Sequence, residues 1–83
     1  MDTELYRILD HLYLKIFDGH AALLMGDRTA REYFYKALNR VIKVAEANGD
    51  KYPQLNQLIF LADEARRTSD ATALISALEE ILK

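Results

Sequence analysis

The sequence predicts an all-α fold, a small antiparallel four-helix bundle. Apolar residues recur at offsets of three and four along almost the whole chain, which is typical of helices with one buried face. No segment alternates polar and apolar residues as a half-buried strand does. The stretches between the apolar stripes are short, which favours antiparallel neighbours. We expect one domain over residues 1–83, with helices at about 3–25, 29–48, 51–67 and 69–82.

The first expected helix has one doubtful point, a glycine in its last third. Its apolar stripe is Leu5, Ile8, Leu9, Leu12 and Ile16. Asp2 or Thr3 can cap its start. A glycine inside a helix costs roughly 1 kcal/mol relative to alanine, so Gly19 is one candidate stop. Because Leu23 returns to the stripe, we favour a helix that continues through Gly19 and stops at Gly26.

The second expected helix, residues 29–48, has the clearest pattern in the chain. Its stripe is Phe34, Ala37, Leu38, Val41 and Ala45. Thr29 and Glu32 fit a capping box, in which the two side chains satisfy free backbone N–H groups. Asn48-Gly49 fits a stop, because glycine readily takes the left-handed conformation that ends many helices.

The last two expected helices follow the loop NGDKYP. Pro53 suits the first turn of a helix, where its missing N–H costs nothing, and Asp50 can act as the N-cap. The third stripe is Leu55, Leu58, Ile59, Ala62 and Ala65, and the fourth is Leu74, Ala77, Leu78 and Ile81. Ser69 or Asp70 can cap the fourth helix.

The composition is typical of a globular protein and excludes functions that depend on cysteine. Half of the residues (51%) are hydrophobic, 29% are charged, and the net charge is −2. The chain contains no cysteine, which excludes disulfides and thiol nucleophiles. No apolar run approaches the roughly 20 residues that cross a bilayer, and the acidic N-terminal segment is unlike a secretory signal. We therefore expect a cytoplasmic protein.

The residue types that carry catalysis form no recognisable arrangement. His11 and His20 are nine residues apart, without the spacing of a helical metal chelate. Adjacent carboxylates such as Glu79-Glu80 diverge around a helix and cannot share a substrate. We expect no catalytic residue, cofactor or metal site, with His11 in solvent and His20 packed near the first stripe.

Positive charge concentrates at the second helix of an otherwise acidic chain. Its basic residues are Arg28, Arg31, Lys36, Arg40 and Lys43. Lys36, Arg40 and Lys43 follow offsets of four and three, so they share one side. Such a row can be a solvated face or can bind an acidic protein, nucleic acid or acidic lipid. The acidic net charge and the lack of a helix-turn-helix pattern make nucleic acid unlikely.

Three apolar residues fall outside the stripes and are candidates for protein contacts. Leu14 lies opposite the stripe of the first helix, and Phe60 and Leu61 lie off the stripe of the third. A helix that is apolar around most of its circumference is either deeply buried or shared with a partner. Both interpretations stay open, and the partner in the second can be another copy of this chain.

The stretch YPQLNQLIFLADEA, with Pro53, Leu55, Asn56 and Leu58, resembles the later half of the small bacteriocin immunity proteins. The segment HLYLKI in the first helix is also similar. The resemblance implies an antiparallel four-helix bundle in the cytosol of a producer bacterium. It also implies a function in protecting the cell against its own pore-forming peptide.

The pattern as a whole predicts a non-catalytic helical module for protein–protein interaction or regulation, with possible self-association through the third helix. An immunity-type protein is the alternative, and a nucleic-acid-binding protein that uses the basic face of the second helix is a third. The partner is a protein of unknown identity or a second copy.

Overall fold

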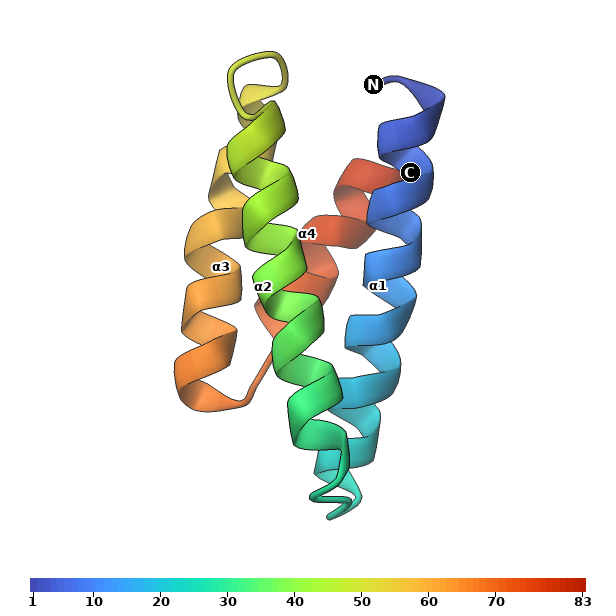
Figure 1. Cartoon of the computed structure of the whole chain (residues 1–83), viewed down its shortest axis with the longest axis vertical. Helices are drawn as coiled ribbons and strands as arrows, with labels where there is room; N and C mark the ends of the chain where they lie inside the picture. Colours follow the sequence, from blue (N-terminus) through green and yellow to red (C-terminus); the bar gives the residue numbers. More distant parts are fainter.

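The computed structural model describes all 83 residues and confirms the all-α four-helix fold. Its elements are α1 (Thr3–Leu24), α2 (Ala30–Asn48), the 3-10 helix η1 (Pro53–Leu55), α3 (Asn56–Thr68) and α4 (Thr72–Leu82). The helices run alternately in opposite directions (Figure 1), with α1 and α3 each packed between α2 and α4.

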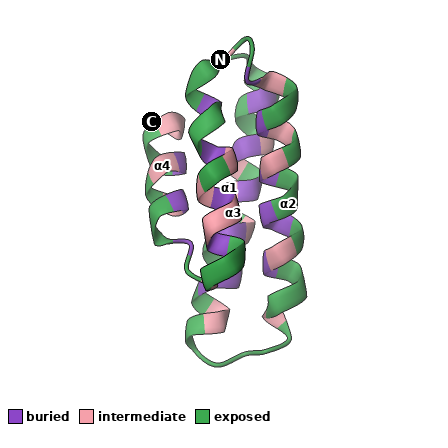
Figure 2. Cartoon of the chain, turned by 90° about the vertical axis from the view of Figure 1, so that its left-hand side faces the viewer, coloured by how far each residue is buried: buried purple, intermediate pink, exposed green.

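The core forms where the four apolar stripes meet. The largest side chains that are fully enclosed are Leu9, Ile16, Phe34, Leu38, Val41, Leu55, Leu58, Leu74 and Leu78. Buried residues lie along the inward sides of the helices, and exposed residues lie along the outer sides (Figure 2). Burial of each such side chain contributes about 1.5–3 kcal/mol, so the amphipathic pattern fixes which side of each helix faces inward.

Helix α1 continues through Gly19, as the sequence predicts, and Gly19 is buried against α2. A Cβ atom at Gly19 would lie 3.2 Å from the Cβ of Phe34. Glycine therefore allows the two helices to approach closely at this level. The helix ends at Leu24, and Gly26 then takes a left-handed conformation with φ of 87°.

Helix α2 begins and ends near the expected residues, but the predicted capping interactions at its two ends are wrong. Thr29 forms no capping bond through its side chain, so the capping box with Glu32 is absent. The carboxylate of Asp27 instead accepts hydrogen bonds from the backbone N–H and the hydroxyl of Thr29. Gly49 is right-handed, with φ of −66°. A side chain at Gly49 would collide with the amide oxygen of Asn56, so close packing accounts for this glycine.

The last two helices begin later than expected. Asp50 caps nothing, and Pro53 opens η1, which leads into α3 at Asn56. Ser69 ends α3 in a left-handed conformation with φ of 61°. The chain therefore leaves the helical path after Ser69, and α4 begins at Thr72 rather than at residue 69.

The two ends of the bundle differ. The α1–α2 connection extends beyond the ends of α3 and α4 in both views (Figures 1 and 2). Both termini lie at the opposite end (Figure 1), where the hydroxyl of Tyr6 donates to the carbonyl oxygen of Leu82 at 3.0 Å. The α1–α2 end is thus a projecting surface, accessible from several sides.

Candidate functional site

The outer side of α2 carries the basic row that its spacing predicts. Lys36, Arg40 and Lys43 are all exposed. Lys36 pairs with Glu32, one turn earlier, at 3.4 Å. Arg40 and Lys43 form no ion pair. Two of the three positive charges of this row therefore have no carboxylate partner.

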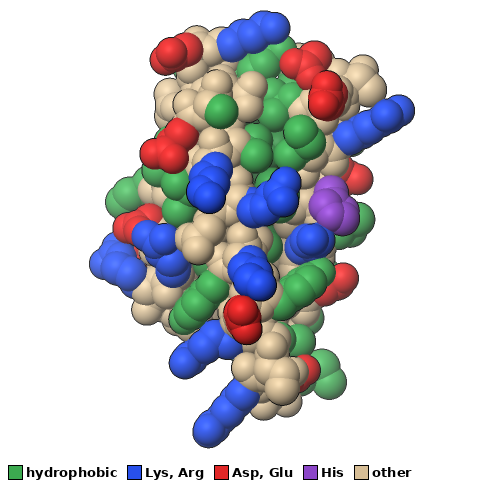
Figure 3. Space-filling model, viewed as in Figure 1, with side chains coloured by type: hydrophobic (Ala, Val, Ile, Leu, Met, Phe, Trp, Pro, Cys, Tyr) green, Lys and Arg blue, Asp and Glu red, His purple; other side chains and the backbone are tan.

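Neighbouring helices widen this row into a face. The Nζ atom of Lys15 on α1 lies 5.8 Å from the centre of the Tyr33 ring on α2. On the other side, Arg66 of α3 donates a hydrogen bond of 2.8 Å to Asn39 of α2. Figure 3 shows Lys and Arg side chains gathered over this side of the molecule. We call the set Lys15, Lys36, Arg40, Lys43 and Arg66 the α2 basic face.

Sequence reasoning missed Lys15 and Arg66 as members of this face. No local pattern marks them, because each comes from a different helix and joins the row only through packing. Their charges are not equivalent: Arg66 also pairs with Asp63 at 2.7 Å, whereas Lys15 forms no ion pair. The unpaired charges of the face are therefore those of Lys15, Arg40 and Lys43.

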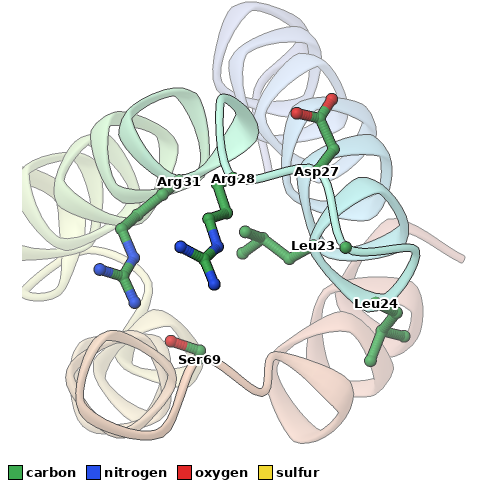
Figure 4. Close-up of a pocket in the computed structure, with 7 residues that line it drawn as sticks. Leu23, Leu24, Asp27, Arg28, Arg31 and Ser69 are labelled. Atoms are coloured by element: carbon green, nitrogen blue, oxygen red, sulfur yellow. The ribbon is translucent and has the colours of Figure 1, made fainter.

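Arg28 and Arg31 lie apart from this face. At 100° per residue, Arg31 is about 140° around α2 from Lys36. The two arginines line an open pocket of about 510 Å³ together with Leu23 and with Ser69 from the α3–α4 connection. In Figure 4 both guanidinium groups point into the opening, toward Ser69. We call this site the arginine pocket.

The three apolar candidates lie in different environments. Leu14 on α1 is 51% exposed and Phe60 on α3 is 64% exposed. Leu61 is half-buried, packs against the core and lines a shallow pocket beside α4. Because α1 and α3 are each packed between α2 and α4, they are diagonal to each other in the bundle. Leu14 and Phe60 are therefore on separate surfaces.

The two histidines lie as expected, with His11 exposed and His20 buried. The Nε2 atom of His20 is 3.4 Å from a carboxylate oxygen of Asp70. Hydrogen bonds from Thr72 and the proximity of His20 lower the pKa of Asp70. The cluster lies at the junction of α1 with the start of α4, where these contacts stabilise the connection between α3 and α4.

The hydroxyl of Tyr13 on α1 donates to the carboxylate of Glu79 on α4 at 3.1 Å. Two effects raise the pKa of Tyr13: the larger is partial removal of its hydroxyl from water, and the smaller is this hydrogen bond to Glu79. The bond links α1 to α4 at the surface of the bundle. No group of three or more His, Asp or Glu residues is arranged to hold a metal ion. None of the four helices combines the length and the apolarity that crossing a bilayer requires.

Comparisons with protein-family models, with curated proteins and with solved structures found no significant match to the chain. The fold and the two positively charged sites define a small four-helix protein with two separate basic surfaces, the α2 basic face and the arginine pocket.

Proposed function

We propose that this chain is a non-catalytic protein-binding module that holds an acidic segment of a partner protein on the α2 basic face. One observation carries the proposal: Lys15, Arg40 and Lys43 are unpaired on one face of a protein whose net charge is −2. Positive charge left free on one face favours an acidic partner.

The chemistry of the face suits carboxylates. An arginine presents a planar fork that can hold a carboxylate through two hydrogen bonds, and lysines add flexible point charges. Exposed ion pairs are individually weak and are screened by salt. We therefore expect moderate affinity and a strong dependence on ionic strength. The cytoplasmic setting expected from the sequence is part of this proposal.

Self-association through α3 is a second candidate, and the 64% exposure of Phe60 favours it. In a symmetric dimer the same patch occurs on both subunits, so the dimer would bury this ring twice. The immunity-type alternative is compatible with four antiparallel helices. It is supported only by the resemblance described above.

The test compares two variants that remove the same charge from different places. Arg40→Gln/Lys43→Gln alters the α2 basic face. Arg67→Gln/Lys83→Gln alters two residues that are already paired with Glu64 and Glu80. Binding of fluorescent poly-L-glutamate is measured by anisotropy at several salt concentrations. The first variant should weaken binding about two- to thirtyfold, since each exposed ion pair contributes about 0.2–1 kcal/mol.

Equal weakening by the two variants would contradict the proposal, because it would show that only the total charge matters. A double-stranded oligonucleotide serves as the competing probe. Tighter binding of the oligonucleotide than of poly-L-glutamate at the same salt concentration would favour the nucleic-acid alternative instead.

A further inference from the structure

The arginine pocket is formed by parts of the chain that are far apart in the sequence. Arg28 comes from the loop before α2, Arg31 comes from the first turn of α2, and Ser69 comes from the α3–α4 connection (Figure 4). The left-handed Gly26 turns the chain after α1, and the bonds between Asp27 and Thr29 hold the loop that precedes α2. The fold therefore places two guanidinium groups in one opening.

Neither arginine has a carboxylate partner. Arg28 and Arg31 form no ion pair, whereas Arg66 and Arg67 on α3 pair with Asp63 and Glu64. Asp27 also lines the pocket, but its carboxylate points away from the opening (Figure 4) and accepts hydrogen bonds from Thr29. Two like charges thus share one pocket, and no carboxylate forms an ion pair with either of them.

The opposite wall is held in place by an aromatic residue. The guanidinium of Arg31 lies 5.9 Å from the centre of the Tyr35 ring. The hydroxyl of Tyr35 is 3.4 Å from that of Ser69. One tyrosine therefore lies against residues of both walls of the pocket. Leu23 points into the same opening and adds an apolar surface beside the charges (Figure 4).

We propose that the arginine pocket binds a phosphomonoester. A phosphate group carries close to two negative charges at neutral pH and has several acceptor oxygens. Arg28 and Arg31 match that charge and can each donate two hydrogen bonds to it, while the hydroxyl of Ser69 donates a further one. The volume of about 510 Å³ exceeds that of a phosphate alone, so the organic part of the ligand lies against Leu23.

The phosphate can belong to a soluble molecule or to a lipid headgroup. Leu24 and Met25, at the projecting tip beside the pocket, are 74% and 88% exposed. Apolar side chains beside cationic ones are typical of surfaces that meet anionic bilayers. Both sources use the same pocket chemistry, and the experiment distinguishes them.

The test is an NMR titration of the full chain with phenyl phosphate. It follows the backbone amide signals of Arg28, Arg31 and Ser69 and the guanidinium signals of the two arginines. Arg28→Gln and Arg31→Gln should each weaken binding about tenfold, which corresponds to about 1.4 kcal/mol. Arg7→Gln removes the same charge from an exposed, unpaired arginine on α1 that belongs to neither basic site, and it should leave binding unchanged. Ser69→Gly accommodates the left-handed backbone, removes the hydroxyl and should weaken binding less than the arginine variants.

The second arm uses phosphatidylcholine vesicles with and without phosphatidic acid. Loss of binding to the phosphatidic acid vesicles in Met25→Ser, with phenyl phosphate binding intact, identifies a lipid source, because Met25 is exposed and does not line the pocket. Phenyl phosphate binding without any preference for phosphatidic acid identifies a soluble source. The proposal is overturned if neither ligand binds, if Arg7→Gln weakens binding as much as Arg31→Gln, or if benzoate binds as tightly as phenyl phosphate.

Discussion

Asp70 connects the start of α4 to the buried part of α1. Its carboxylate accepts hydrogen bonds from the backbone N–H and the hydroxyl of Thr72 and lies 3.4 Å from the Nε2 atom of His20. The bonds from Thr72, with a smaller contribution from His20, hold the pKa of Asp70 below its usual range. The ionised carboxylate is therefore the form that the folded chain prefers.

This preference predicts a dependence of stability on pH. A carboxylate whose pKa is lower in the folded state stabilises the fold above its unfolded pKa of about 3.9, and that stabilisation is lost as the pH falls through the folded pKa. Asp70→Asn should therefore lower the melting temperature at neutral pH and lose less stability than the wild type below about pH 4. Thermal melts followed by circular dichroism from neutral to acidic pH measure both effects.

Asp18 provides the control, because it is exposed and its carboxylate forms no ion pair. Asp18→Asn should follow the wild-type curve. If the curves of the wild type and Asp70→Asn stay parallel through the acidic range, the contacts of Asp70 do not favour its charged form.

At the scale of the helices, the apolar spacing predicts the interiors and tertiary contacts decide the ends. The stripe of α1 runs through Gly19 without a change of phase, so its continuity could be read from the sequence. The role of Gly49 could not, because the residue that crowds it, Asn56, belongs to the next helix. The capping box failed for a different reason: Asp27 competes for Thr29 from two residues upstream.

The close approach of α1 and α2 at Gly19 predicts an effect that depends on side-chain size. Gly19→Ala should be nearly neutral, because a gain in helix propensity of about 1 kcal/mol offsets a tight contact with Phe34. Gly19→Val should lower the free energy of unfolding by about 1–3 kcal/mol, since it overpacks the contact. Urea denaturation measures both changes.

Ala21→Val is the matched control, because Ala21 is exposed on the same helix and its variant reports the helix propensity of valine alone. A loss at Gly19→Val no larger than that at Ala21→Val would show that the α1–α2 contact tolerates an added side chain.

At the scale of the whole molecule, the sequence predicts the architecture more fully than the candidate sites. The spacing of Lys36, Arg40 and Lys43 already indicates one shared side of α2. The angle of Arg31 could also have been derived from its five-residue offset from Lys36. That Arg31 and Ser69 line one pocket could not be derived, because it depends on how α2 meets the α3–α4 connection.

The exposure of Phe60 predicts that the fold tolerates a charge at this position. Phe60→Glu should change the free energy of unfolding by no more than about 0.5 kcal/mol, as is usual for exposed sites. Leu38→Ala, in the core, should cost about 2–5 kcal/mol. Chemical denaturation measures both changes, and sedimentation of Phe60→Glu tests the self-association candidate.

If the chain self-associates through α3, the wild type should sediment as a dimer and Phe60→Glu should sediment as a folded monomer. A wild type that is monomeric at all concentrations would exclude self-association. Unfolding of Phe60→Glu would place its ring in the core, contrary to its exposure.

The position of the two termini determines how the protein is oriented when it is attached to a surface, a label or a fused domain. Both lie at the end of the bundle opposite the arginine pocket (Figure 1), and the long axis measures 38 Å. A bead, dye or fused domain joined before Met1 or after Lys83 would stand most of that length away from Arg28 and Arg31. A sensor surface coated through either terminus would thus present the arginine pocket outward, with the α2 basic face along the side.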